Sequence, residues 1–253
     1  MWHGDYRFLL KNLILKDFRI RYRNMSLGMF WSLLNPLIML GVYTFVFTKI
    51  FRNPVPHWSV FVLCGIVPFN FFSMAWGAAT TSMVDNAGLI KRLPVPREIV
   101  PVASVLSNCL HLIIQIVILL AVALLTGVGA NIYWLWLPVI WFLEIVFVCG
   151  LGLLFASINV YIRDTRYVVE SANIVLFWLV PIIYQFSMIP AQYRDIYQYN
   201  PVAALVLAMR AVLLDGKAPS DVLLTKLALV SFSILAIGWL TFRRFKLRFY
   251  DHL

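Results

Sequence analysis

The chain has 253 residues, of which 62% are hydrophobic and only 13% are charged, and its formal net charge is +10. Soluble domains are nearer one quarter charged, so this composition excludes an ordinary soluble protein and predicts one that crosses a membrane several times. A basic soluble chain would suggest nucleic acid binding. Here most Lys and Arg residues stand beside apolar runs, so anionic membrane lipids are the expected partner and no nucleic acid is expected.

The first 26 residues form a basic, amphipathic segment. Four apolar residues share one helical face, which predicts an interfacial helix: Tyr6, Leu9, Leu10 and Leu13. Four cations, called the basic cluster below, then precede the first long apolar run: Lys16, Arg19, Arg21 and Arg23. The alternation of residues 19–23 is also typical of a strand, but a lone strand at a membrane surface would leave its edges unpaired, so a helix is favoured.

Six apolar runs are long enough to span a membrane, since a helix needs about 20 apolar residues to cross roughly 30 Å of hydrocarbon. They predict an all-α membrane protein with six transmembrane helices, over residues 27–50, 58–84, 99–125, 133–162, 168–189 and 222–242. Pro181 is expected to bend the fifth helix. In the fourth helix, Gly152 and Ala156 are small residues four apart, which indicates a helix-packing seam.

A shorter apolar stretch lies between the fifth and sixth runs, within residues 190–220. Asn200 suits a helix N-cap, Pro201 suits the first turn and Gly216 suits the stop. A helix of about 14 residues rises only about 21 Å, which is too little to cross the membrane, and this one contains Arg210. It is therefore expected to be re-entrant or interfacial, covered by protein or by water.

Most of the 21 Lys and Arg residues fall on one side of this topology, together with both termini. Because cytoplasmic loops contain the excess of Lys and Arg, both termini are expected in the cytoplasm, and so is the loop of residues 85–98. His111 and Glu144 are expected near the middle of the bilayer. An unpaired carboxylate there would cost about 2.5 kcal/mol or more, so a pair between the two is predicted, with a packing hydrogen bond as the alternative.

The sequence contains no glycine-rich phosphate-binding loop, so the chain is expected neither to hydrolyse ATP nor to hold catalytic residues. It has no paired acids that would hold Mg²⁺ against a lipid pyrophosphate, which counts against an enzyme that remodels polyprenyl-phosphate glycans. No cluster has the spacing of a metal site, and Cys64, Cys109 and Cys149 are interpreted as core thiols. These observations favour a transport protein without an energy source of its own.

Four segments, in this order and at this spacing, resemble a known family. They are "RYRNMSLGMFWSLLNPL" (residues 21–37), "GLIKRLPVPREIVP" (88–101), "NVYIRDTRYV" (159–168) and "YNPVAALVLAMRAVLL" (199–214). The family is the membrane subunit of ABC-2 type exporters of lipid-linked polysaccharides. The resemblance implies one ABC-2 type transmembrane domain over residues 1–253, in a bacterial inner membrane, that exports a polyprenyl-diphosphate-linked polysaccharide such as O-antigen. Teichoic acid, another lipid-linked glycan and a small hydrophobic drug are the alternative substrates.

The resemblance also implies partners, and no cofactor in this chain. Two copies of the chain would form the pore, and two copies of a separate cytoplasmic ATPase would bind ATP and Mg²⁺ beneath it. The implied ATPase contacts lie in the loop of residues 85–98: Leu89, Ile90, Lys91, Arg92 and Arg97. An ordinary basic cytoplasmic loop would look the same. The implied gate region, residues 190–220, includes Tyr199, Asn200, Pro201 and Arg210.

The first and fifth spans are implied to line the channel. Aromatic rings stack on sugars, and amides meet sugar hydroxyls, so the predicted lining is Phe30, Trp31, Asn35, Tyr43, Phe47, Asn173, Phe177, Trp178, Tyr184 and Gln185. The alternative for each is a lipid-facing or helix-packing position. The basic cluster is predicted to bind the substrate diphosphate, because Arg forms paired hydrogen bonds to phosphate oxygens. The alternative is membrane anchoring, worth about 1 kcal/mol per cation.

Overall fold

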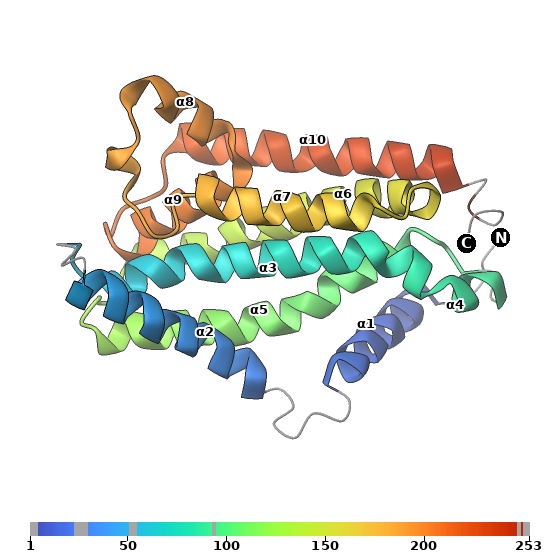
Figure 1. The fold of residues 1–253 in the computed structure, drawn as a ribbon, viewed down its shortest axis with the longest axis horizontal. Helices are drawn as coiled ribbons and strands as arrows, with labels where there is room; N and C mark the ends of the chain where they lie inside the picture. Colours follow the sequence, from blue (N-terminus) through green and yellow to red (C-terminus); the bar gives the residue numbers. More distant parts are fainter. Residues whose placement is uncertain (1–4, 23–29, 51–54, 93–94, 247–248, 250–253) are drawn as a thin grey trace.

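The computed structural model describes residues 5–22, 30–50, 55–92, 95–246 and 249, and within them it contains helices and turns but no strand. Four helices in this part of the chain are long and apolar enough to cross a membrane. They are α3 (Trp58–Asp85), α5 (Ile99–Leu125), α6 (Leu137–Tyr161), which follows the 3-10 helix η2 (Ile132–Trp136), and α10 (Asp221–Phe245). These helices run side by side along the molecule (Figure 1). The all-α class and helices at four of the six predicted spans are confirmed.

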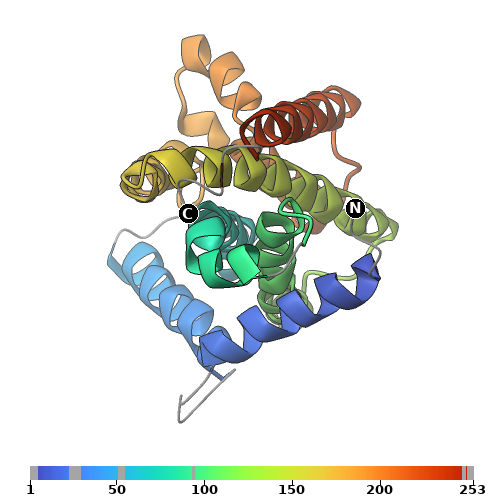
Figure 2. The same ribbon diagram turned by 90° about the vertical axis from the view of Figure 1, so that its right-hand side faces the viewer.

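Helix α3 lies at the centre of the bundle, packed against α5, α6 and α9 (Figure 2). Its residues are apolar on every side, as expected of a helix that is covered all round. The ring of Phe72 stacks on that of Phe147 in α6, with centroids 6.0 Å apart. A Cβ added to Gly152 would lie only 2.8 Å from the Cβ of Ala79. The predicted packing seam in α6 therefore contacts α3 at Gly152.

Helix α10 crosses α6 where each helix has a glycine. A Cβ added to Gly238 would lie 2.2 Å from the carbonyl oxygen of Gly150. A Cβ added to Gly150 would lie 2.5 Å from the backbone nitrogen of Leu235. The two backbones are therefore in direct contact, and this crossing requires glycine in both helices.

The first predicted span is helical in all of its described residues, 30–50. α2 (Phe30–Thr44) continues as the π-helix η1 (Phe45–Ile50), and residues 27–29 of the predicted span lie outside the described residues. The apolar part that is described, Leu37–Ile50, is below the length of a membrane span. The predicted count of six spans is not confirmed.

The prediction that Pro181 only bends the fifth span is wrong. α7 (Thr165–Leu179) ends two residues before this proline, and Val180 is already extended, at φ −88° and ψ 134°. Proline has no N–H for the helix ladder and disfavours helical backbone at the residue before it. The segment that follows α7 is therefore irregular, and its carbonyl groups need partners from elsewhere in the protein.

Short helices fill the segment between α7 and α10: η3 (Phe186–Met188), α8 (Ala191–Tyr199) and α9 (Pro201–Leu213). The start of α9 is as predicted, because the Asn200 side chain accepts hydrogen bonds from the backbone N–H groups of Val202, at 3.1 Å, and of Ala203. Gly216 follows the helix with φ +58°, a conformation that favours glycine. α9 has 13 residues and is mostly buried against α3, α6 and α10. A short helix covered by protein is what the sequence predicted here.

Two helices lie at the end of the bundle that holds both termini: α1 (Tyr6–Tyr22) and α4 (Ala87–Arg92) (Figure 1). This end is called the α4 end below, and the opposite end, with α8 and α9, is called the α9 end. α1 is helical through Arg19 to its last residue, so the choice of helix over strand is confirmed. It packs against α5, with Leu13 buried.

Candidate functional site

A polar pocket of about 440 Å³ lies at the α4 end, between α1, α3 and α5. It is called the polar pocket below. Hydroxyl and charged side chains line much of it: Lys16, Asp17, Thr81, Ser82, Asp85, Ser104 and Ser107. All of these groups can bind sugar hydroxyls, but only the hydroxyl groups and Lys16 can donate to a phosphate oxygen. The sequence analysis did not identify this pocket, although two serines three apart in the apolar α5 were an available signal.

Lys16 is the member of the basic cluster that reaches this pocket. Its Nζ donates a hydrogen bond to Oδ1 of Asn86 and lies 2.9 Å from Oδ1 of Asp17. Asn86 in turn donates from Nδ2 to the backbone oxygen of Ser82, at 2.8 Å. The Lys16 charge is therefore held in the wall of the pocket by neighbouring side chains, where it can still meet a polar ligand.

The other members of the basic cluster lie at or beyond the end of α1. Arg19 is exposed. Arg21 belongs to α1, but its side chain is outside what the structure describes, and Arg23 lies outside the described residues. The convergence of the cluster on a diphosphate therefore stays a prediction.

Helix α4 is anchored on one face and exposed on the other. Ile90 is buried, in an apolar cluster with Leu13 of α1 and Val100 of α5. Lys91 and Arg92 are exposed. A short helix fixed by one apolar residue and presenting two cations outward is a surface to which another protein can bind.

The remainder of this loop is tied to the end of α10. Arg97 donates a hydrogen bond from Nη1 to the backbone oxygen of Lys246. Glu98 Oε1 lies 3.5 Å from Lys246 Nζ. The α4 segment and the end of the last long helix therefore form one connected surface.

At the α9 end, the predicted gate residue Arg210 is buried, with 7% of its surface exposed. Its Nη2 donates to the backbone oxygens of Ile182, at 2.7 Å, and of Phe61, at 3.3 Å. Nη1 donates to the backbone oxygen of Tyr184 at 3.4 Å, and the guanidinium carbon lies 3.4 Å from the centroid of the Phe61 ring. Arg210 thus binds two carbonyl groups of the irregular segment that follows α7, those of Ile182 and Tyr184, and joins them to the Phe61 carbonyl of α3.

The sequence singled out Arg210 but not its partners. Burial lowers the pKa of Arg210 to about 10, so the side chain remains charged at neutral pH. A cavity of about 390 Å³ lies beside it, with His57, Gln185 and Asp215 in its lining. The α9 end therefore combines a fixed internal cation with a polar cavity.

The predicted channel residues do not form one continuous surface in the described part of a single chain. Phe47 packs on Trp58 of α3, with centroids 5.2 Å apart, and Phe177 packs edge-on against Phe69, at 5.4 Å. Trp178 is 64% exposed. The side chains of four predicted residues lie outside what the structure describes: Phe30, Trp31, Asn35 and Tyr199.

Three more predicted channel residues lie on or near the same helices. The Tyr43 ring is 6.5 Å from that of Phe47. The Tyr184 hydroxyl donates to the backbone oxygen of Trp178 at 3.0 Å, and Asn173 is half-buried on α7. Figure 2 shows α2 and α7 on the same side of α3, so the two helices predicted to line a channel border one face of the chain.

The predicted pair between His111 and Glu144 is not joined by a hydrogen bond, and whether the two side chains meet stays a prediction. Glu144 is buried, but neither of its carboxylate oxygens has a hydrogen-bond partner among the described residues. Nε2 of His111 instead lies 2.9 Å from Nε2 of Gln115, one turn along the same helix. Partners four residues apart on one helix are neighbours, so this contact is the packing hydrogen bond that the sequence analysis gave as the alternative.

The sequence profile of the ABC-2 type transporter family matches residues 9–214. An O-antigen export system permease protein, RfbA, of Klebsiella pneumoniae is 28% identical over 246 residues, which cover 97% of this chain and 95% of that protein. An O-antigen export system permease protein, RfbA, of Myxococcus xanthus is 26% identical over a region that covers 91% of this chain and 90% of that protein. A polysialic acid transport protein, KpsM, of Escherichia coli is also 26% identical, with 91% of each chain covered.

Proposed function

Because the chain belongs to the ABC-2 type transporter family, we propose that it is the membrane-spanning permease of a polysaccharide exporter. The observation that carries this proposal is the similarity over more than nine tenths of the chain to proteins named for O-antigen export and polysialic acid transport. Four helices of spanning length make it a multi-pass membrane protein. Permeases of this family are transmembrane subunits rather than ATPases.

The substrate in this proposal is a polysaccharide linked to a polyprenyl diphosphate, of the O-antigen type. Its diphosphate is held at the α4 end by Arg19 and its neighbours in the basic cluster, and its sugar hydroxyls meet the polar pocket. Cations at headgroup depth and hydroxyl groups beside them suit a ligand that joins a diphosphate to sugars. Teichoic acid or another lipid-linked glycan would use the same groups. Export of a small hydrophobic drug is less well supported, because it would not need this polar pocket.

The energy for export comes, in this proposal, from a separate ATPase. The ATPase binds ATP and Mg²⁺ and docks on this chain at the α4 end. Two copies of the ATPase act on two copies of this chain. The exposed cations of α4, Lys91 and Arg92, and the half-buried Leu89 beside them are its docking surface. In this proposal the chain lies in the inner membrane of a bacterium, with the α4 end and both termini in the cytoplasm. Helices α8 and α9 are gate helices on the outer side.

Deletion of the gene in a strain that makes the glycan tests this proposal. We expect the lipid-linked glycan to accumulate on the inner face of the membrane and to disappear from the cell surface, and the wild-type chain to restore export. The purified complex should hydrolyse ATP faster when lipid-linked glycan is added. Undiminished export from the deletion strain, or stimulation by hydrophobic drugs and not by glycan, would show that the proposed substrate is wrong.

A further inference from the structure

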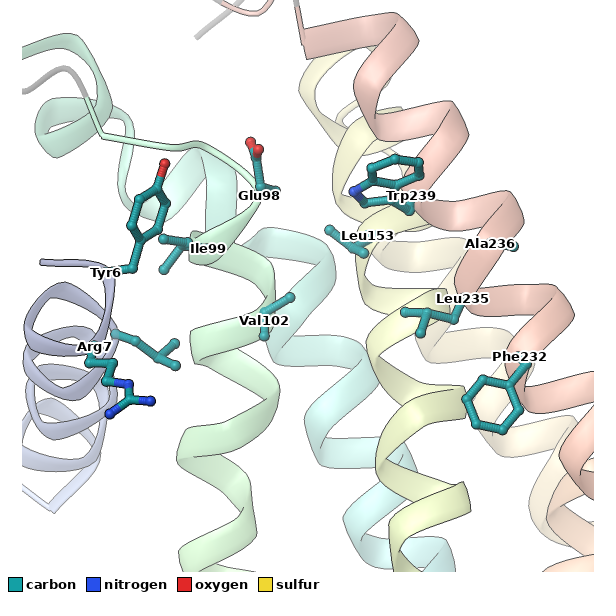
Figure 3. Close-up of a pocket in the computed structure, with 11 residues that line it drawn as sticks. Tyr6, Arg7, Glu98, Ile99, Val102, Leu153, Phe232, Leu235, Ala236 and Trp239 are labelled. Atoms are coloured by element: carbon teal, nitrogen blue, oxygen red, sulfur yellow. The ribbon is translucent and has the colours of Figure 1, made fainter. Parts of the chain in front are cut away.

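An apolar groove of about 710 Å³ runs between α1 and α10 at the α4 end (Figure 3). Its floor is formed by Val102 of α5 and Leu153 of α6, and Phe232 and Leu235 form the wall on the side of α10. α1 forms the opposite wall with Leu10. The close-up shows Val102, Leu153, Leu235 and Phe232 around the space between α1 and α10. We call this space the α1–α10 groove.

The α1–α10 groove is separate from both the polar pocket and the helices predicted to line a channel. Its residues on α1 belong to the beginning of that helix, from Tyr6 to Leu10, whereas the polar pocket uses the end of α1, from Lys16 to Ile20. In the end-on view the beginning of α1 lies on the right, and α2 and α7 lie on the left (Figure 2). The groove therefore faces the surroundings of the bundle rather than the proposed substrate path.

The groove and a neighbouring hollow together extend along α10 for more than the depth of one membrane leaflet. A second hollow, of about 410 Å³, continues along α10 to Thr225 and shares Phe232 and Ala236 with the groove. From Trp239 to Thr225 the helix rises by about 21 Å. Half the hydrocarbon thickness of a bilayer is about 15 Å. A lipid chain that lies along α10 would therefore be in contact with the protein throughout its leaflet.

The charged groups at the groove favour an anionic headgroup. Arg7 and Glu98 are the charged side chains of the lining, and Glu98 is paired with Lys246 at 3.5 Å. Arg243 lies over the Trp239 ring, 4.6 Å from its centroid, at the end of the same wall. Arg7 and Arg243 are both exposed. An acidic headgroup in the groove would meet the exposed guanidinium group of Arg7, while the carboxylate of Glu98 already has a cation beside it.

We propose that a phospholipid with an anionic headgroup occupies the α1–α10 groove. Its acyl chain fills the apolar space along Leu235 and Phe232, and its phosphate accepts hydrogen bonds from Arg7. The lipid joins the interfacial helix α1 to the last spanning helix α10, which pack on different neighbours, α5 and α6. It acts as a structural component of the protein and not as the exported substrate.

Site-directed photo-crosslinking tests this site in the full chain. A benzophenone amino acid replaces Ala236, which lines the groove, or, as a control, Ile113, which is exposed on α5 outside it. The protein is reconstituted in vesicles of phosphatidylcholine with a minority of phosphatidylglycerol. We expect phosphatidylglycerol in the crosslinks at residue 236 to be enriched about fivefold over its share of the membrane, the factor expected of one basic contact at a membrane surface.

Charge substitutions then identify the headgroup contact. Arg7→Gln should reduce the crosslinks at residue 236 to the membrane composition, whereas Arg166→Gln, at an exposed position on α7, should leave the enrichment unchanged. Crosslinks at residue 236 in proportion to the membrane composition would overturn the proposal. So would equal enrichment at residues 236 and 113, enrichment that survives Arg7→Gln, or crosslinks to a protein partner in place of lipid. None of these results depends on polysaccharide export, so the proposed function is tested separately.

Discussion

The α4 end and the α9 end of the molecule use cationic side chains in opposite ways. At the α4 end, Arg19, Lys91 and Arg92 are exposed. At the α9 end, Arg210 is buried and donates hydrogen bonds from Nε, Nη1 and Nη2 to backbone oxygens of its own chain. Removal of a buried, fully engaged cation destabilises a fold, whereas an exposed cation contributes little to stability and can bind another molecule. The surroundings of an arginine, not its identity, decide which role it has.

Arg210→Met tests the buried side of this comparison and is expected to have the largest effect. The variant keeps an apolar side chain but removes the donors to the backbone oxygens of Phe61, Ile182 and Tyr184. Each of these groups that stays unpaired costs about 1–3 kcal/mol. We expect low yield and a clearly lower unfolding temperature for the purified chain. The matched control is Arg166→Met, at an exposed position, and equal stability of the two variants would contradict the assigned role.

Gly238→Ala tests the close packing of α10 on α6, which lies between the two ends and involves no charged side chain. The added Cβ would lie 2.2 Å from the backbone oxygen of Gly150, so α10 must move away from α6. Overpacking of this kind costs about 1–3 kcal/mol, measured as a fall in unfolding temperature. Gly77→Ala is the control, because nothing lies within 4 Å of a Cβ there. An unfolding temperature for Gly238→Ala as high as that of Gly77→Ala would show that the crossing can relax.

The double variant Lys91→Glu, Arg92→Glu tests the exposed side of the comparison. Its unfolding temperature should match the wild type, because both side chains are exposed. Recovery of the ATPase partner with the tagged chain should fall about tenfold, because reversed charges at an interface disfavour association. Lys217→Glu at the α9 end is the charge-matched comparison and should leave recovery unchanged. Normal recovery with the double variant would exclude these two cations from the docking surface.

Replacement of Arg19, Arg21 and Arg23 by Gln is expected to have the smallest effect on the fold, within about 0.5 kcal/mol. The effect should appear in function. Lipid-linked glycan should no longer stimulate ATP hydrolysis by the complex, while the basal rate stays the same. The stimulation curves of variant and wild type, in anionic and in neutral vesicles, give the measurement. If the variant is stimulated as strongly as the wild type in both kinds of vesicle, these cations serve only to anchor the chain to the membrane.

Local signals in the sequence predicted much of the fold. Apolar runs located α3, α5, α6 and α10, and a cap residue followed by proline located the start of α9. The effect of Pro181 was underestimated, because whether a proline bends or ends a helix depends on what can pair with the released backbone groups. Here Arg210 pairs with them, from 28 residues further along the chain in the case of Ile182. Pairing across such a distance leaves no periodic pattern in the sequence.

The candidate site was less predictable for the same reason. The sequence indicated that Lys91 and Arg92 lie in the loop of residues 85–98, since a basic loop between two apolar runs is a local feature. The polar pocket requires hydroxyl groups of α3 and α5 to face Lys16 of α1, and that arrangement exists only after the helices pack. His111 contacts a neighbour one turn away, Gln115, and a contact of this local kind is visible in the sequence as a spacing of four residues.

The position of Arg210 in the chain has a consequence for biosynthesis. Phe61, Ile182 and Tyr184 all precede it, so every group of this buried site has been made before α10 leaves the ribosome. Chains fold from the N-terminus during synthesis. The α9 end can therefore close around Arg210 first, and α10 then docks through Gly238 on a surface of α6 that already exists. Translation order makes α10 the last of the four long helices to dock.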